Sequence, residues 1–361
     1  MSQSLSIAVQ GCAHGELSTI YKAIEDRCKT KWPDLLIILG DFQSLRNEQD
    51  LESIAVPEKY KKMGDFHKYY SGELQAPLPT IFIGGNHECM QGLAELPFGG
   101  FVAENFYYMG YSGSIVVKGV VISGLSGIYK RHDFNAARPS LAVIKSQGWG
   151  KYVRNLYHVR QSDVEPLFML DHTDVMLSHD WPNGIVQHGD TKRLLKLKPF
   201  FKEDIRSNNL GSPVSWQLLR KLMPKWWLSA HLHVKFEAEF VNNKRGLEER
   251  NPDEIDLDLD FDPQTQAPEK PLTTRFLALD KCGRNRKHLE IITLSVDPNH
   301  ATFYDGPLKI YSNPEFVANR KFLAEHPCTE RLEGLDFDQL REDRGPLKDV
   351  NWEDYELKDF K

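Results

Sequence analysis

The sequence lacks several common signals, and each absence excludes a class of protein. The five cysteines are scattered and form no CxxC pair, which argues against a disulfide scaffold and is typical of a reduced, intracellular chain. No apolar run is long enough for a transmembrane helix, and the N-terminus leads directly into a predicted strand, so we expect neither a membrane partner nor a signal peptide. The net charge of −6 argues against a general nucleic-acid coat protein but not against a local basic groove.

Two catalytic signatures are missing as well. The chain has neither a P-loop nor a Gly-x-Ser-x-Gly nucleophile elbow, and it shows no internal repeat. Its 361 residues can bury a substantial core in one large domain or in two. The motifs that are present indicate a metal-dependent chemistry that needs neither signature.

The most informative stretch is Gly84-Gly85-Asn86-His87-Glu88, which follows the apolar residues 80–83. The apolar run predicts a buried strand, and two glycines at its end let the backbone turn and approach a ligand closely. Asn86 offers a neutral oxygen to a metal, and His87 can bind a metal or transfer a proton.

Four further predicted strand ends also finish in residue types that bind metals. Each residue alone has an ordinary interpretation: Cys12 as a small buried hydrophobe, Asp41 as a turn cap and His179 as a core histidine. Five such strand ends favour a shared site, because open α/β sheets place their sites at the carboxyl ends of the strands. The candidate residues are Cys12, His14, Asp41, Asn86, His87, His179, His231 and His233.

This set suits a site for two metal ions. A carboxylate can bridge two ions through its two oxygens, and Asp41 is the best candidate because only Gly40 separates it from its strand. Two ions about 3.5–4 Å apart would clamp a phosphoryl oxygen and acidify a bound water. His87, beside Asn86, could then protonate the leaving oxygen.

The pattern of elements predicts the fold. Strands alternate with helices in the first part and β-hairpins follow, which indicates an α/β fold in which two sheets form a sandwich flanked by helices. Residues 126–162 are predicted to be a surface insertion, because basic and aromatic residues are interleaved there without a core pattern. We assign residues 1–250 to the catalytic domain, 251–271 to an acidic loop, and 272–361 to strands that complete the sandwich and a helical C-terminal extension.

The motif series resembles that of the calcineurin-like metallophosphoesterases: Gly-Asp at 40–41, Gly-Asn-His-Glu at 85–88, Ser-His-Asp at 178–180 and a late His-x-His at 231–233. The superfamily normally begins with Asp-x-His and carries a second aspartate after Gly-Asp. Here Cys12 replaces the first aspartate, and no second aspartate follows Asp41. In both departures the chain resembles the RNA lariat debranching enzymes. It also resembles them in Tyr69-Tyr70-Ser71-Gly72 and Leu96-Pro97-Phe98-Gly99-Gly100, and the resemblance covers roughly residues 5–330.

This resemblance implies hydrolysis of the 2′,5′-phosphodiester bond at the branch point of intron lariats, with branched RNA as the partner and His87 as the catalytic acid. It also implies two divalent metal ions. The implied ligands are Cys12, His14, Asp41 and His233 for one ion, and Asp41, Asn86, His179 and His231 for the other.

Cys12 affects the choice of metal. A thiolate is a softer ligand than a carboxylate, so we expect Zn²⁺ or Fe²⁺ beside it, and iron, zinc or manganese in the other position. The alternative is that Cys12 points away from the site and that the first metal binds weakly.

The insertion is the expected contact for RNA that is not in a duplex, because aromatic residues stack on bases and basic residues bind phosphates. The alternative is that these tyrosines are core residues and these cations are merely solvated. The candidates, including two from an earlier loop, are Tyr69, Tyr70, Tyr129, Lys130, Arg154, Tyr157, His158 and Arg160.

Two other functions stay open at this point: a different phosphodiesterase or phosphatase of the same superfamily, and a non-catalytic scaffold of the same fold. Cys12 and the insertion count against the first, and the complete set of ligand types counts against the second. We expect a monomer in the nucleus, with the cytoplasm as a further location, since lariat RNA is the implied substrate.

Overall fold

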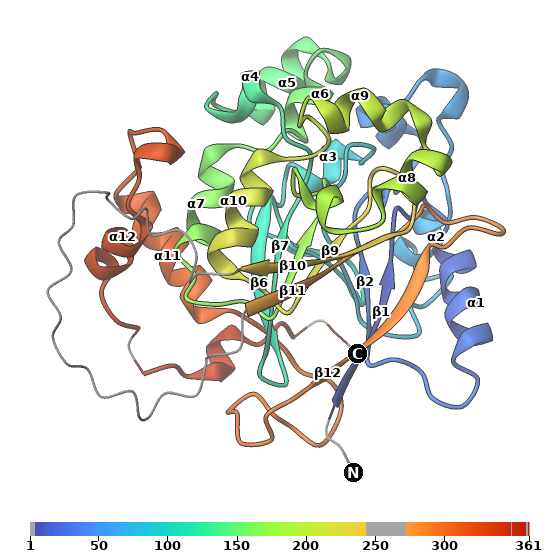
Figure 1. Ribbon diagram of the computed structural model, residues 1–361. Helices are drawn as coiled ribbons and strands as arrows, with labels where there is room; N and C mark the ends of the chain where they lie inside the picture. The colour runs from blue at the N-terminus through green and yellow to red at the C-terminus, as the bar shows by residue number, and fades with distance from the viewer. Residues whose placement is uncertain (1–3, 243–271, 348, 359, 361) are drawn as a thin grey trace, which may run out of the picture.

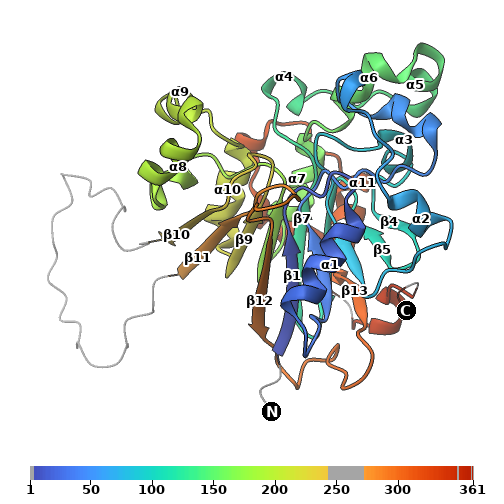
Figure 2. The same ribbon diagram turned by 90° about the vertical axis from the view of Figure 1, so that its right-hand side faces the viewer.

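The computed structural model describes residues 4–242, 272–347, 349–358 and 360, so the predicted acidic loop 251–271 lies outside the described residues. Two β-sheets pack face to face, and helices cover the outer face of each sheet (Figures 1 and 2). This confirms the predicted two-sheet α/β sandwich. Among the described helices, none is both long enough and apolar enough to cross a membrane.

Thirteen strands build the two sheets in the described part of the chain. They are β1 (Ser4–Gln10), β2 (Leu35–Ile38), β3 (Thr80–Phe82), β4 (Gly100–Ala103), β5 (Phe106–Tyr108), β6 (Ser112–Val117), β7 (Val120–Leu125), β8 (Val175–Ser178), β9 (Trp226–Ser229), β10 (Phe236–Asn242), β11 (Leu272–Ala278), β12 (Leu289–Ser295) and β13 (Ile310–Ser312). The first sheet has the order β12-β1-β2-β3-β5-β4, and the second has the order β10-β11-β9-β8-β7-β6-β13.

The helices lie mostly in the connections between strands. They are α1 (Leu17–Arg27), α2 (Phe66–Tyr70), α3 (Met90–Leu93), α4 (Arg131–Phe134), α5 (Leu141–Gln147), α6 (Trp149–Leu156), α7 (Gln161–Phe168), α8 (Thr191–Leu197), α9 (Lys202–Arg206), α10 (Pro213–Leu222), α11 (Pro314–Glu325) and α12 (Phe337–Arg344). Helical apolar spacing in the sequence predicts helices at 16–29, 216–222, 319–325 and 336–342, which overlap α1, α10, α11 and α12. Several short helices are missed because they have too few turns to show a hydrophobic period.

The strands that lead to the predicted site are parallel. β1, β2 and β3 pair in parallel in the first sheet, and β8 and β9 do so in the second. Every residue of β2, β3 and β8 is buried, as expected for strands covered on both faces. Parallel strands end at the same edge, so the loops that follow them meet there.

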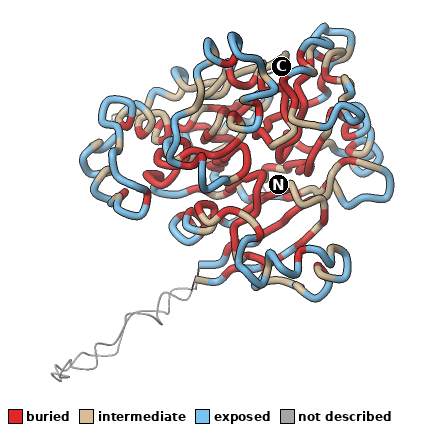
Figure 3. The backbone as a smooth tube through the Cα atoms, turned by 90° about the horizontal axis from the view of Figure 1, so that it is seen from above, coloured by how far each residue is buried: buried red, intermediate tan, exposed pale blue. Residues whose placement is uncertain are grey.

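Three apolar layers hold the sandwich together. Between the sheets, Ile7 and Ile37 of the first sheet belong to one cluster with Ile122 and Leu177 of the second. Figure 3 shows buried chain running through the middle of the molecule with exposed chain around it. Burying a branched aliphatic side chain contributes about 1.5–3 kcal/mol, so this layer is a major source of stability.

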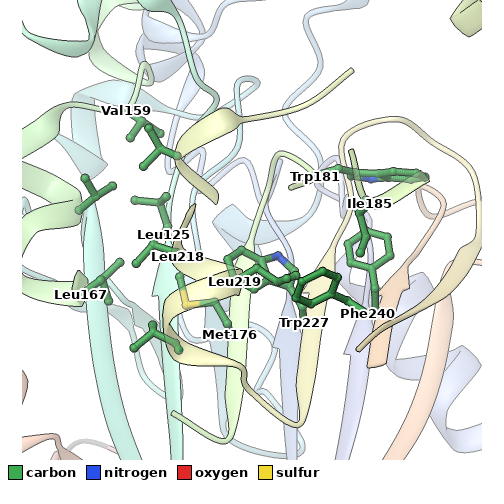
Figure 4. Packing of buried hydrophobic residues seen from close by; sticks show 14 of the residues in the cluster. Leu125, Val159, Leu167, Met176, Trp181, Ile185, Leu218, Leu219, Trp227 and Phe240 are labelled. Carbon is green, nitrogen blue, oxygen red and sulfur yellow. The ribbon is translucent and has the colours of Figure 1, made fainter. Parts of the chain in front are cut away.

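The outer face of each sheet is covered by its own helices. α1 and α2 cover the first sheet, where Leu17, Ile20 and Phe66 pack with the sheet residue Phe82. On the second sheet, Leu218 of α10 packs in one cluster with Met176 and Trp227 (Figure 4). The two outer clusters pack on the faces of the sheets, and the loops that carry the site residues lie at the carboxyl edge of the parallel strands.

Residues 126–162 are only partly the surface insertion that the sequence predicts. Helix α5 is mostly exposed and α4 and α6 are partly exposed, but Ile128, His158, Val159 and Arg160 are buried. The backbone N–H of Val159 donates to the carbonyl oxygen of Ile128 (3.0 Å), so the two ends of the segment pair with each other and are drawn into the core.

Candidate active site

The loops after β1, β2, β3, β8 and β9 bring all of the predicted metal-binding residues to one place. Two glycines make this approach possible. A Cβ at Gly40 would clash with the ring of His179, and a Cβ at Gly85 would clash with the carboxylate of Asp41. The backbone at both positions therefore lies against the neighbouring site residue, as close packing at a ligand site requires.

Backbone strain is concentrated in the same loops. His14, Asp41, His231 and His233 have φ angles of 51°, 48°, 60° and 50°, in the left-handed region that residues with a Cβ rarely adopt. Each such residue costs about 1–3 kcal/mol and persists only where the surrounding structure imposes it, and such residues cluster at functional sites.

Cys12, His14, Asp41 and His233 form the first half of the site. One potential ligand atom from each lies within 4.8 Å of the others. The Nε2 atoms of His14 and His233 are 3.2 Å apart, and Nε2 of His14 is 3.7 Å from Oδ2 of Asp41. Cys12 therefore faces this cluster, which excludes the alternative that it points away.

Asn86, His179 and His231 form the second half around the other oxygen of Asp41. Nε2 of His179 lies 3.5 Å from Oδ1 of Asp41 and 3.2 Å from Oδ1 of Asn86. The ring centroids of His179 and His231 are 5.0 Å apart. Nδ1 of His179 donates to the carbonyl oxygen of Leu39 (2.7 Å), which leaves the lone pair of Nε2 directed at the site.

The carboxylate of Asp41 lies between the two halves and is fully buried. Its Oδ1 accepts the backbone N–H of His87 (2.9 Å), whereas Oδ2 is buried without a hydrogen-bond partner among the described residues. Burial acts to raise the pKa of Asp41, but His179, His14 and His87 outweigh it and hold the pKa well below its ordinary value. Asp41 is thus an anion with one oxygen that lacks a partner, as a bridging metal ligand would be.

Burial favours the neutral form of the four histidines that are predicted to bind metal. Burial, the largest cause, lowers the pKa of His14 and His179, and it lowers that of His231 to about 4 and that of His233 to about 3. Neutral imidazoles offer lone pairs to a metal. Burial and then the charge of Asp41 raise the pKa of Cys12, so its thiol keeps its proton until a cation displaces it.

These donors fit two divalent ions. The first half offers a sulfur, two imidazoles and a carboxylate oxygen, and the second offers two imidazoles, an amide oxygen and the other carboxylate oxygen. Nitrogen and sulfur donors of this kind suit zinc and iron. The buried Oδ2 of Asp41, which lacks a partner, supports this fit independently of any motif.

His87 is the only predicted catalytic residue, and it lies at the edge of the first half. Its ring centroid is 5.9 Å from that of His14, and its Nδ1 is 3.2 Å from the carbonyl oxygen of Ala55. The ring is half-buried, so it can reach both the site and a bound substrate. Its role in proton transfer stays a prediction.

Sequence reasoning missed Glu88, although it stands in the most informative motif. Its buried carboxylate accepts the backbone N–H groups of Phe42 (2.9 Å), Gln43 (2.8 Å) and Gly85 (2.8 Å). These bonds join the loop that carries Asp41 to the loop that carries Asn86. Burial, followed by the charge of Asp41, acts to raise the pKa of Glu88, and the three backbone N–H groups that face only its carboxyl oxygens oppose this rise and favour the carboxylate.

Trp181 plays a comparable part between the loops after β8 and β9. Its indole N–H donates to the carbonyl oxygen of Ala230 (2.7 Å), and the backbone N–H of Ala230 donates to the carbonyl oxygen of His179 (3.2 Å). No motif indicates this role, because the partner atoms belong to the backbone.

The predicted RNA contacts divide by exposure. Lys130, Arg154 and Tyr70 are exposed, and Tyr129 and Tyr157 are half-buried. Tyr69, His158 and Arg160 are buried, and each forms a hydrogen bond inside the protein: Tyr69 with Ser18 (3.2 Å), His158 with Asp133 (2.6 Å) and Arg160 with the carbonyl oxygen of Asn155 (2.9 Å). Their placement supports the alternative of structural residues for these three, and RNA contact by the other five stays a prediction.

Comparison with known proteins agrees with the fold and the site. Residues 5–235 match the family model of calcineurin-like phosphoesterases, so the chain is a metal-dependent phosphoesterase of that class with a site for two divalent ions. Residues 271–340 match the model of the C-terminal domain of lariat debranching enzymes. The chain belongs to the lariat debranching enzyme family.

Individual relatives show how far the similarity extends. The chain is 49% identical to the lariat debranching enzyme of Saccharomyces cerevisiae, over 98% of this chain and 93% of that one. It is 39% identical to that of Arabidopsis thaliana, over 91% of this chain and 71% of the other. With the enzyme of Homo sapiens it shares 44% identity over 82% of this chain, which spans about half the length (50%) of the human protein.

Proposed function

We propose that this protein hydrolyses the 2′,5′-phosphodiester bond at the branch point of excised intron lariats and so yields linear RNA. The observation that carries the hydrolytic part is the buried carboxylate of Asp41, whose two oxygens face separate sets of metal-binding residues. The substrate follows from the relatives named lariat debranching enzyme, one of them similar over 98% of the chain.

Each side chain has a defined task in this proposal. Cys12, His14, Asp41 and His233 would hold one divalent ion, and Asp41 with Asn86, His179 and His231 would hold the other. When bound, two such ions lower the pKa of a water molecule and neutralise charge on the scissile phosphate.

His87 donates the proton that the leaving oxygen needs. Its Nδ1 is engaged by Ala55, so Nε2 is the nitrogen that carries this proton. Glu88 and Trp181 keep the ligand loops in register through their backbone contacts. The exposed Lys130 and Arg154 neutralise RNA phosphates, and Tyr157 offers a ring on which a base can stack.

The choice of metals is part of the proposal. Cys12 favours Zn²⁺ or Fe²⁺ in the first position, and iron, zinc or manganese suits the second. Since lariats arise by splicing, we also propose that the protein resides in the nucleus, which imaging of the tagged protein tests. We further propose that it acts as a monomer, which its sedimentation behaviour tests.

The test is cleavage of a synthetic branched RNA beside a linear 3′,5′ control, with single metals added back after chelation. Cleavage of the branched RNA alone, restored by Zn²⁺ or Fe²⁺, supports the proposal. Cleavage of an aryl phosphodiester but of neither RNA, under every metal, contradicts the substrate while leaving the phosphodiesterase site intact.

A further inference from the structure

The loop between β11 and β12, residues 280–287, lies against the first half of the site. The backbone N–H of Cys282 donates to the carbonyl oxygen of Cys12 (2.8 Å), and that of Gly11 donates to the carbonyl oxygen of His288 (2.9 Å). A Cβ at Gly11 would clash with the carbonyl oxygen of Asp280. The loop is therefore fixed beside a predicted metal ligand.

This loop, called here the basic loop, is strongly positive in a chain whose net charge is −6. The basic loop contains four cations and one acid, which are Lys281, Arg284, Arg286, Lys287 and Asp280. Asp280 forms an ion pair with Arg286. In the described part of the chain, Lys281, Arg284 and Lys287 form no ion pair, and Arg284 and Lys287 are exposed. Cations without a protein partner at the mouth of a site are available to an anionic ligand.

The first half of the site, beside which the basic loop lies, is partly accessible to solvent. The side chain of His14 is 23% exposed, so a ligand in solvent can reach the first half of the site. Lys198, just after α8, lies near enough for Lys281 and Arg286 to lower its pKa after burial, with Asp280 opposing them.

The predicted RNA contacts lie along a different rim. The backbone N–H of Gly127 donates to the carbonyl oxygen of Gly84 (2.8 Å), which attaches the insertion to the loop of Asn86. The backbone N–H of Tyr129, next to Lys130, donates to Oδ2 of Asp180 (3.2 Å) in the loop of His179. The insertion thus borders the second half of the site, and the basic loop borders the first.

A branch-point nucleotide is linked to RNA through its 5′, 3′ and 2′ oxygens, so its arms diverge from the scissile bond. We propose that the basic loop binds the phosphates of one RNA arm that leaves the branch point on the Cys12 side, through Lys281, Arg284 and Lys287. This inference rests on the proposed function, because it takes the branched RNA as the substrate. Contacts of this kind bind the backbone without reading sequence.

The experiment compares RNA binding by two triple variants in a His87→Ala background, in which cleavage should be about 10²–10⁴-fold slower. One carries Lys281→Gln, Arg284→Gln and Lys287→Gln. The matched control carries Lys29→Gln, Lys31→Gln and Lys321→Gln, which removes the same charge from exposed positions beyond the end of α1 and on α11. Fluorescence anisotropy measures the Kd for a branched RNA with long arms and for a branched trinucleotide without arms, and metal content is measured in parallel.

The basic-loop variant is expected to raise the Kd of the long-armed RNA about tenfold or more and to flatten its salt dependence by about 0.7 in slope per lost contact, while the control changes neither. The Kd of the branched trinucleotide and the metal content should be unchanged. An equal loss for both RNAs, or a loss of metal, overturns the proposal, as does an unchanged Kd for the long-armed RNA. Failure of the otherwise wild-type protein to cut branched RNA contradicts the proposed function instead, and the binding comparison still decides the role of the loop.

Discussion

Nδ1 of His87 lies 3.2 Å from the carbonyl oxygen of Ala55. A carbonyl oxygen can only accept a hydrogen bond, so this contact places a proton on Nδ1. Nε2 is then the nitrogen that gains and loses the second proton. Ala55 thereby orients the ring and determines which nitrogen can serve as the acid.

Replacing His87 with alanine should lower kcat for branched RNA about 10²–10⁴-fold, the usual contribution of a general acid. An aryl phosphodiester, whose leaving group needs no proton, should be cleaved nearly as fast as by the unchanged protein. Single-turnover rates on both substrates measure this. The control is His326→Ala, which removes an exposed histidine outside the site. Equal losses on both substrates in His87→Ala would show that His87 does not act as the acid.

Replacing Cys12 with aspartate restores the residue usual in the superfamily and should change the metal preference. A carboxylate is harder than a thiolate, so we expect weaker activation by Zn²⁺ and stronger activation by Mn²⁺. Titration of the metal-free protein with each ion measures the two affinities. Cys89→Ser removes another buried thiol outside the cluster and should leave the preference unchanged. An unaltered preference in the aspartate variant would contradict a ligand role for Cys12.

In Glu88→Gln the amide oxygen can still accept the backbone N–H groups of Phe42 and Gly85, but the amide NH2 then faces the N–H of Gln43, which now donates to the second carboxylate oxygen. The unmet hydrogen bonds should cost about 1–3 kcal/mol of unfolding free energy. Metal affinity should fall as well, because the link between the loops of Asp41 and Asn86 is weakened. Urea unfolding and metal titration test this, with Glu165→Gln as a control for a buried glutamate remote from the ligands. Normal metal affinity in Glu88→Gln would limit Glu88 to a role in stability.

Asp50 should confer a pH-dependent stability on the segment that ends at Ala55. Burial acts to raise its pKa, but Arg46, which donates from Nε (2.9 Å) and Nη2 (2.9 Å), holds that pKa below its ordinary value of 3.8. A carboxyl with a lowered pKa in the folded state stabilises the fold above about pH 4, and this contribution is lost as the pH falls through the lowered value.

Asp50→Asn should therefore destabilise the protein at pH 7 by about 1–3 kcal/mol, and its deficit relative to the unchanged protein should shrink below pH 4. Urea unfolding from pH 7 down to the acid limit of folding measures the difference. Asp204→Asn, on an exposed turn of α9, should show little deficit at any pH. A deficit for Asp50→Asn that is constant with pH would argue against the ionic contact as its origin.

Much of the site was predictable because local chemistry and strand order carry it. The apolar runs before Asp41, Asn86 and His179 predict buried strands, and the carboxyl ends of parallel strands meet at one edge. The glycines at 84 and 85 predict a close backbone approach, and the structure shows that Gly85 lies against Asp41. Gly40 lies against His179 in the same way, which the sequence did not predict.

Other features depend on long-range packing that no local pattern records. Arg160 and His158 share the basic and aromatic composition of an RNA-binding surface, yet both are buried, because the ends of the insertion pair with each other. The basic loop shows a run of cations in the sequence, but its place beside the site depends on backbone hydrogen bonds, from Cys282 to Cys12 and from Gly11 to His288.

The sequence by itself determined the chemistry of this protein: which donors are present, that one of them is a thiol, and which strands deliver them. Only the tertiary structure decided how these donors share Asp41, which cations border the site and which are internal. The reason is physical, since residue type sets what an atom can bind, whereas burial and partner are properties of contacts between segments as distant as Cys12 and Cys282.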